Sequence, residues 1–371
     1  MRKIVYLLLF LVPFFSNCWA QADGAQQQTS TPELAAQPKN ETAAPEKPKF
    51  DARLKVVEAV TSKTELALGF SDLQCDEDGN IYLGVEYGGG STSIRKMNSA
   101  GELVARFEPY GVSEVQVLGA GSYAISSDGN LYTWVGNQKD GFFYILAFAS
   151  DGHFKSKTKL DPGVPWIPAS LAAFQNGNFL MTGQVGDGNS RSPMVPFTAI
   201  FRADGKLLKQ ISLEDDGEIY DLTKARDPKL ISVAVPASDR AVAWGRAEAA
   251  KDGNVYVMRW MSPALIYAIS AGGAVVRKFS VDPGDKALMP VMMHVSGGRI
   301  AVLFRNEATR EQSVKVVNLE GEEIANYDAS PHDEKMAIGA AFACYFAKQT
   351  RFIFLASDDD RRIMLRAFEP K

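Results

Sequence analysis

The sequence predicts an all-β protein: a six-bladed β-propeller of four-stranded antiparallel blades, closed by an N-terminal strand that completes the last blade. Three observations lead to this prediction. Strand-like runs recur about every 50 residues, each recurrence contains two turn signals, and one additional strand-like run precedes the first recurrence. Radial repetition of small sheets produces a propeller and leaves only short sheet edges.

Composition is that of a large globular protein. The chain has 371 residues, of which 46% are hydrophobic and 10% aromatic. Such a chain buries a large core, and it resembles neither a disordered nor a disulfide-dense polypeptide. The formal net charge is −4, so the generic attraction of a cationic protein to phosphate backbones is missing. We therefore expect no nucleic-acid partner.

The N-terminal region predicts export. Residues 1–22 have a basic start, an apolar run over 4–15 and small residues at the end, which is the pattern of a secretory signal peptide. The apolar run is shorter than the roughly 20 residues that span a bilayer, so no transmembrane segment is expected after signal removal. Residues 23–50 are rich in Gln, Ala, Pro and Thr and predict a disordered linker. Residues 51–371 form the propeller, which we expect to be extracytoplasmic, either periplasmic or secreted.

The first turn of each repeat precedes a β-rich run. Its copies are "DGNIY" (78–82), "DGNLY" (128–132), "NGNFL" (176–180), "DGNVY" (252–256) and the degenerate "GGRIAVL" (297–303) and "QTRFIFL" (349–355). Successive copies begin 45 to 52 residues apart, except for one interval of 76. The surplus, "IYDLTKARDPKLISVAVPASDR" (219–240), is interpreted as a loop inserted on one face of the ring.

A second turn follows each of the first five copies by 20 to 28 residues. These turns are "AGELV" (100–104), "DGHFK" (151–155), "DGKLL" (204–208), "GGAVV" (272–276) and "EGEEI" (320–324). Gly and Asn accept the positive φ of tight hairpin turns, so two hairpins per repeat predict a four-stranded meander. The sixth repeat ends after its third strand, and "ARLKVVEAV" (52–60) is left over at the start. Pairing of these two segments would close the ring and hide both edges.

The repeat unit resembles a known group of propellers. "DGNIY" followed by "IRKMNSAGELVARF", with its copies over 60–371, is similar to NHL-type repeats and to the wider group of six-bladed propellers that includes TolB-like domains and the gluconolactonase family. The shared residues are turn glycines and strand apolar residues, so the resemblance implies the fold and no particular chemistry. Gluconolactonase-like enzymes gather Glu, Asn and Asp ligands around one divalent metal at a channel mouth.

The acidic stretch "DEDGN" (76–80) is interpreted as a turn. A calcium loop requires the pattern D-x-[DN]-x-[DN]-G with a Glu at its twelfth position. Here Gly79 precedes Asn80, and the twelfth position holds no Glu. We expect Asp78, Asp128 and Asp252 to bind the backbone of their own turns.

Candidate binding residues come from the inner strands, which line the central channel. Counting back six residues from each first turn selects Asp72, Ser122, Ser170, Arg246, Val291 and Ala343. This ring contains a single carboxylate, and Glu114 and Glu248 join it only in another register. Among the three histidines, only His294 lies on an expected inner strand, where a structural role is favoured over a ligand role.

Loop residues supply a further candidate. Trp260, flanked by Arg259 and Met261, follows a predicted strand, and Trp and Arg are frequent binding anchors. The complete candidate binding set is Asp72, Ser122, Ser170, Arg246, Glu248, His294 and Trp260. It includes no catalytic and no metal-ligating residue.

These observations predict a non-enzymatic binding or scaffold protein that recognises a protein, peptide or glycan through one face of the ring. No cofactor is predicted. The alternative is a metal-dependent, lactonase-like hydrolase with a site at the channel mouth, holding a divalent metal such as calcium. Cys75 and Cys344 fall on inner strands of the first and last blades, which closure makes neighbours. They form either a disulfide, which needs Cα atoms within about 7 Å, or two buried thiols.

Overall fold

The computed structural model describes residues 49–65, 69–86, 92–164, 166–185, 195–213, 246–259, 261–306, 308–330, 341–357 and 362–371. They belong to one compact unit, residues 47–371. The expected signal peptide, all but the end of the expected linker, and the insertion at 219–240 lie outside these residues. Within the described ranges, no helix has the length and apolar character needed to cross a membrane.

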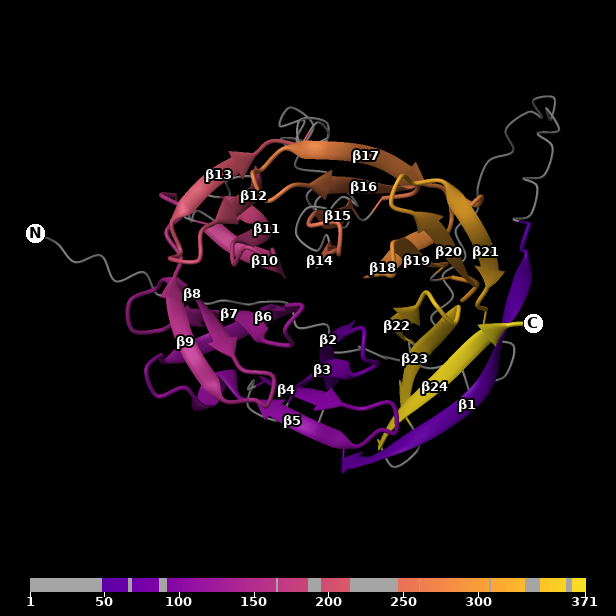
Figure 1. The fold of residues 1–371 in the computed structure, drawn as a ribbon, viewed down its shortest axis with the longest axis horizontal. Coiled ribbons are helices and arrows are strands. Elements are labelled where there is room, and N and C mark those ends of the chain that lie inside the picture. The colour runs from indigo at the N-terminus through magenta and orange to yellow at the C-terminus, as the bar shows by residue number, and fades with distance from the viewer. Residues whose placement is uncertain are drawn as a thin grey trace, which may run out of the picture. The chain divides into compact units, whose positions relative to one another are not determined.

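Four sheets are antiparallel meanders with their strands in chain order (Figure 1). Their strands are β2 (Gly69–Cys75), β3 (Ile81–Glu86), β4 (Thr92–Met97) and β5 (Leu103–Phe107); β6 (Val117–Ile125), β7 (Leu131–Asn137), β8 (Phe143–Phe148) and β9 (Phe154–Lys159); β10 (Trp166–Ala173), β11 (Phe179–Val185), β12 (Val195–Phe201) and β13 (Leu207–Ile211); and β14 (Arg246–Ala249), β15 (Val255–Arg259), β16 (Ala264–Ile269) and β17 (Val275–Val281). A short 3-10 helix, η1 (Pro109–Gly111), follows β5. The predicted four-stranded meanders are confirmed.

The remaining strands form one sheet of eight. It contains β18 (Met289–Ser296), β19 (Arg299–Arg305), β20 (Gln312–Asn318), β21 (Glu323–Asp328), β22 (Ala341–Phe346), β23 (Arg351–Ser357), β24 (Arg362–Pro370) and the N-terminal β1 (Ala52–Glu65). Strand β1 pairs antiparallel with β24, with Val56 opposite Phe368. It meets β21 in parallel through only Ala52 and Arg53. The predicted pairing of the N-terminal strand with the last strand of the chain is confirmed.

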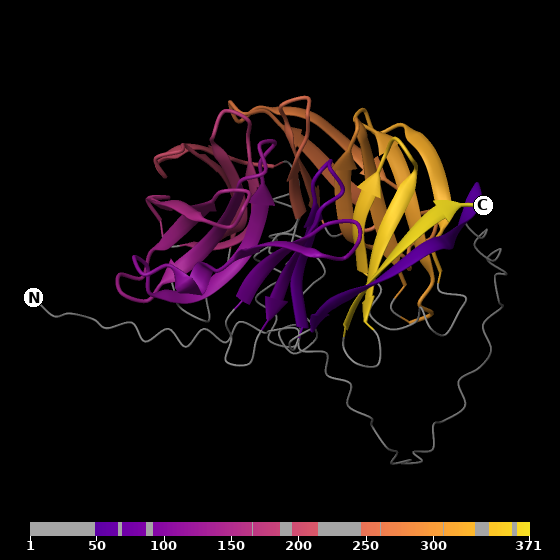
Figure 2. The same cartoon turned by 60° about the horizontal axis from the view of Figure 1, so that its bottom comes forward.

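The sheets surround a common centre. The first strand of each meander contacts the first strand of the next, in the order β2, β6, β10, β14, β18, β22 and back to β2. Figure 1 looks down on these inner strands, with later strands farther out, and Figure 2 shows the same arrangement tilted. The fold is therefore an all-β propeller with four-stranded antiparallel blades.

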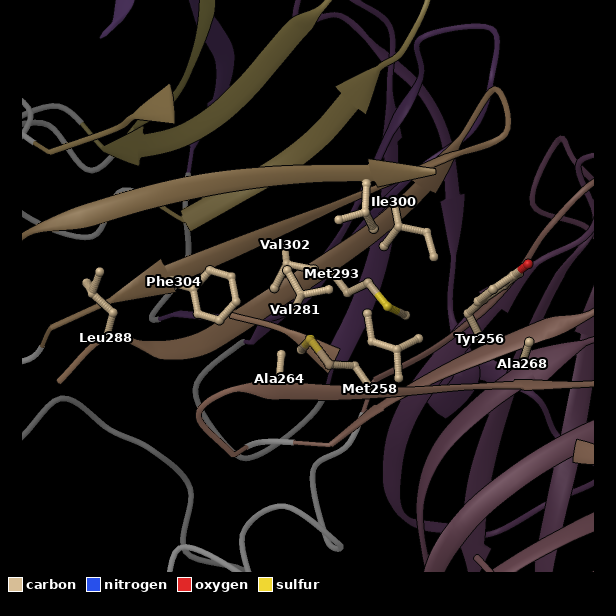
Figure 3. Close-up of a cluster of buried hydrophobic side chains, with 12 residues drawn as sticks. Tyr256, Met258, Ala264, Ala268, Val281, Leu288, Met293, Ile300, Val302 and Phe304 are labelled. Atoms are coloured by element: carbon tan, nitrogen blue, oxygen red, sulfur yellow. The ribbon is translucent and has the colours of Figure 1, made fainter. Parts of the chain in front are cut away.

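Apolar side chains fill the space between neighbouring sheets. Figure 3 shows one such cluster, in which Met258 of β15 and Ala264 of β16 face Met293 of β18 and Val302 of β19. Every residue of β15 is buried, because this strand has a sheet packed against each of its faces. A strand covered on both faces is apolar almost throughout instead of alternating, which explains the continuous apolar runs in the sequence.

The first turns are hairpins whose aspartates bind the turn itself. In "DEDGN", Asp76 Oδ1 accepts hydrogen bonds from the backbone N–H groups of Asp78 (3.1 Å) and Asn80 (2.9 Å). The turn interpretation is thus supported, but the acceptor is Asp76, two residues before the expected Asp78. Asp128 binds neighbouring side chains, whereas Asp252 accepts from the backbone N–H two residues later at 3.0 Å, as expected.

The second turns hold adjacent sheets together at the outer rim. Gly152 and Gly205 have φ of +95° and +81°. A Cβ atom at Gly152 would lie 2.1 Å from the carbonyl oxygen of Arg106, and one at Gly205 would lie 1.9 Å from that of Lys159. Both carbonyls belong to the outer strand of the preceding sheet. Glycine is required here for the positive φ and also for the close approach of two backbones.

Candidate functional site

Five side chains from four inner strands meet at the centre of the ring. Arg246 and Glu248 come from β14, His294 from β18, Cys75 from β2 and Cys344 from β22. We call these five residues the central cluster. Three of them, Arg246, Glu248 and His294, are candidates from the sequence, and the two cysteines were expected to be neighbours.

Glu248 is a buried carboxylate with two hydrogen-bond donors and a histidine around it. Its side chain is 9% exposed, Arg246 Nε donates to Oε1 at 2.7 Å, and the Val295 N–H donates to Oε2 at 2.8 Å. His294 Nδ1 lies 3.1 Å from Oε2. Burial by itself raises the pKa of Glu248, but the charges of His294 and Arg246 and the hydrogen bonds outweigh it and lower the pKa to about 2. The carboxylate is therefore ionised at neutral pH.

The opposite edge of the His294 ring faces sulfur. Nε2 lies 3.1 Å from Sγ of Cys75, which forms a disulfide with Cys344 across a Cα–Cα distance of 5.7 Å. Of the two alternatives for this pair, the structure has the disulfide. Cys344 is fully buried, whereas Cys75 is partly exposed. Cys75 is thus the more exposed residue of the pair.

The central cluster also spans the ring. A guanidinium nitrogen of Arg246 donates to the backbone carbonyl of Leu73 in β2, although β14 and β2 are not adjacent in the order of inner strands. The contact of His294 in β18 with Cys75 in β2 likewise passes over β22. The polar groups of the central cluster therefore link inner strands that are not neighbours.

Two other candidates take part in hydrogen bonds inside the ring. Ser122 Oγ in β6 donates to the carbonyl of Ala169 in β10 at 2.9 Å, which joins two neighbouring sheets. Ser170 Oγ lies 2.8 Å from Thr182 Oγ1 of β11 in its own sheet. Trp134 Nε1 donates to the same Ala169 carbonyl at 3.1 Å. These polar groups therefore form hydrogen bonds within the propeller itself.

The structure does not describe the side chains of the remaining candidates. Asp72 and Ala343 lie in β2 and β22, but their side chains fall outside the described part of the structure. Trp260 lies outside the described residues. The interpretation of its neighbour Arg259 as an exposed anchor is wrong, because Arg259 is 1% exposed at the end of β15. Sequence reasoning missed this burial because a terminal Arg on a strand is usually solvated.

Acidic, His and Cys side chains do not gather into a metal-binding group in the described ranges: no set of three or more of them is placed to hold an ion. Glu114, the other carboxylate considered from the sequence, is exposed and pairs with Lys157 at 3.6 Å. His153 is exposed on a second turn with its Nδ1 3.0 Å from Asp151.

Sequence reasoning missed a groove at the outer rim, which we call the β5 groove. It consists of two hollows of about 420 and 340 Å³ that share Gly152. The first is lined by Leu103, Val104, Ala105, Arg106, Asp151, Gly152 and His153, and the second by Glu108, Gly111, Val112, Ser113, Glu114, Phe148, Gly152 and Phe154. Val104 is 52% exposed. No sequence signal pointed to it, because the exposure of Val104 on this outer strand becomes evident only in the structure.

Comparison with known proteins identifies no family for this chain. No protein-family model matches the chain, and no curated protein matches it. Solved structures that are similar include a Bacteroides caccae protein of unknown function, at 12% identity with 71% of this chain and 83% of that chain covered and a TM-score of 0.45. A PQQ-bound aldose sugar dehydrogenase from Streptomyces coelicolor matches at 12% identity, 87% and 100% coverage and a TM-score of 0.43. YCF48 bound to D1 peptide matches at 10% identity, 83% and 94% coverage and a TM-score of 0.38.

Proposed function

We propose that this protein is an exported, non-enzymatic six-bladed propeller that binds an extended segment of a protein or peptide in the β5 groove. One observation carries the proposal. Two hollows adjoin at Gly152, and their lining combines the exposed apolar side chain of Val104 with charged residues. Propellers suit such a role because rigid blades hold variable turns in fixed positions.

The lining of the β5 groove fits a polypeptide. Val104 offers apolar surface, Arg106 and Asp151 offer charges of opposite sign, and β5 is the outermost strand of its sheet. An extended peptide presents alternating side chains and backbone amides, which match apolar pockets, charged groups and a strand edge. The mixed charge gives the occupant a defined direction. A glycan remains the other class of ligand in the proposal.

The inner ring supports a structural role for the channel. Ser122, Arg246, Glu248 and His294 already bind one another or the backbone of other inner strands. Buried polar groups that satisfy each other strengthen a rigid framework. We therefore place ligand binding at the rim, while the central cluster holds the blades.

The count of six blades rests on the eight-stranded sheet. Its two halves, β18–β21 and β22–β24 with β1, are each antiparallel meanders, and only two residue pairs of β1 and β21 join them. We count these halves as separate blades, in keeping with the NHL-type resemblance. A crystal structure with a continuous, unbroken ladder between β21 and β1 would contradict this count.

A peptide selection tests the binding proposal. The full mature chain is immobilised, a random peptide library is selected on it, and the affinity of an enriched peptide is measured by fluorescence anisotropy. We expect Val104→Glu to weaken binding at least tenfold, about 1.4 kcal/mol. Val276→Glu is the matched control, because Val276 is 51% exposed on β17, the outer strand of another sheet. Equal affinity of both variants, or no enriched peptide, would overturn the proposal.

The metal-dependent alternative is tested separately. A ligand that binds only the folded state raises the melting temperature. Thermal melts with calcium, magnesium and zinc therefore distinguish the two functions: a specific upward shift with one ion favours the hydrolase, and unchanged melting favours the binding protein.

Export is tested by expressing the complete chain and locating the mature form by cell fractionation.

A further inference from the structure

The disulfide of the central cluster lies in an environment suited to thiol chemistry. Cys75 is partly exposed and Cys344 fully buried, so Cys75 is the residue of the pair at which attack by an external thiol is favoured. His294 Nε2 lies 3.1 Å from Sγ of Cys75. A structural disulfide needs no such neighbour, and the binding function above leaves the arrangement unused.

We propose that Cys75–Cys344 is an exchangeable disulfide that reacts with low-molecular-weight thiols at Cys75, and that His294 stabilises the Cys75 thiolate when the pair is reduced. A cationic imidazole next to a thiolate favours the charged form of the sulfur, as in other reactive cysteines. Glu248 is the positioning residue: its Oε2 lies 3.1 Å from Nδ1, which directs the other ring nitrogen towards sulfur. Arg246 and the Val295 N–H hold that carboxylate in place.

The exchange takes place in two steps. The thiolate of a first small thiol attacks Cys75 Sγ and forms a mixed disulfide; the bond to Cys344 breaks, and the Cys344 sulfur takes the proton released by the attacking thiol. A second thiol then attacks the outer sulfur of the mixed disulfide. The small disulfide leaves, and Cys75 departs as a thiolate beside His294, with the proton shared between them. Two thiols are oxidised and one protein disulfide is reduced, so atoms and electrons balance.

Reduction of this disulfide would remove the covalent link at the place where the ring closes. The disulfide joins β2 to β22, 269 residues apart in sequence, where the first and last meanders meet. When small thiols are oxidised at this site, the Cys75–Cys344 bond that links the first and last meanders is broken. The site is independent of the β5 groove, which lies at the outer rim.

Differential alkylation tests the proposal on the full chain. The protein is reduced with dithiothreitol under native conditions, freed of reductant without oxygen, and labelled with iodoacetamide for increasing times; mass spectrometry then reports each cysteine. We expect Cys75 to be labelled at least tenfold faster than Cys344, and His294→Gln to slow labelling of Cys75 about tenfold while circular dichroism stays unchanged. His153→Gln is the matched control, since His153 also has a carboxylate beside Nδ1.

Two results would overturn the proposal. One is a disulfide that dithiothreitol reduces only after denaturation, which makes it a structural link. The other is equal labelling of the two cysteines, or labelling of Cys75 that does not respond to His294→Gln. The comparison of Cys75 with Cys344 within the unmodified chain keeps the test decisive even if the His294 variant fails to fold.

Discussion

Replacing Glu248 with Gln removes the charge at the centre of the ring without changing the size of the side chain. The pKa of Glu248 falls from 4.5 to about 2 in the folded protein. Each unit of pKa difference is equivalent to about 1.36 kcal/mol, so the ionised carboxylate contributes about 3 kcal/mol to the free energy of unfolding at neutral pH. Single domains are stable by about 5–15 kcal/mol, which makes this a large share.

The sign of the effect gives it a pH signature. Because the folded-state pKa lies below the unfolded one, the contribution is fully present above pH 4.5 and is lost as pH falls towards 2. We expect Glu248→Gln to destabilise the protein by about 3 kcal/mol at pH 7 and by much less at pH 2.5. With a urea m-value of about 3 kcal/mol/M, the unfolding midpoint shifts by about 1 M at pH 7.

Urea titrations followed by tryptophan fluorescence at the two pH values measure this difference. Glu102→Gln serves as the control, because Glu102 is an exposed carboxylate on a second turn and its replacement should stay within about 0.5 kcal/mol. A Glu248→Gln variant that loses the same stability at pH 7 and pH 2.5 would refute the electrostatic argument, since a loss of packing does not depend on pH.

Two further predictions concern turns and ring closure. Gly205→Ala should cost at least about 2–3 kcal/mol, because its Cβ would meet a backbone carbonyl of the preceding sheet at 1.9 Å, whereas Gly253→Ala, with φ +84° and open space, should cost about 1 kcal/mol. Leu54→Ala on β1, buried in an apolar cluster, should cost about 2–5 kcal/mol, and Val57→Ala on the same strand, 37% exposed, under about 1 kcal/mol. Thermal melts by circular dichroism measure all four. Equal losses within either pair would contradict the reasoning.

The sheets were predictable because their signals are local. A turn glycine such as Gly79 or Gly253 has φ near +85° in the structure. Glycine adopts a positive φ more readily than other residues, so its position in the sequence indicates the turn. The pairing of β1 with β24 followed from counting strands. The last repeat has three strands and one strand is left over at the start, so pairing the two leaves neither with an unpaired edge. Even so, the acceptor in the first turn is Asp76, two residues before the expected Asp78.

The candidate site was predictable only as a set of positions. Arg246, Glu248 and His294 were selected for their place on inner strands, but their contacts with one another and with β2 depend on distances across the ring, which no local pattern encodes. The β5 groove arises from the gap between two sheets and has no signature in either strand alone. Burial of Arg259 likewise depends on the neighbouring sheet. Contacts between distant segments are set by tertiary geometry, and one sequence without relatives does not reveal them.

Pairing of β1 with β24 has a consequence for synthesis. Strand β1 leaves the ribosome first among the strands of the ring, and its partner emerges roughly 300 residues later. At about 5–20 residues per second, the first strand waits roughly 15 to 60 seconds for its place in the last meander. During that interval Leu54 of β1, which is buried in the finished protein, and the backbone edge that pairs with β24 are uncovered and available to a chaperone. A chain truncated before β24 lacks the partner strand of β1. The last sheet of the ring can therefore be completed only after β24 has been synthesised.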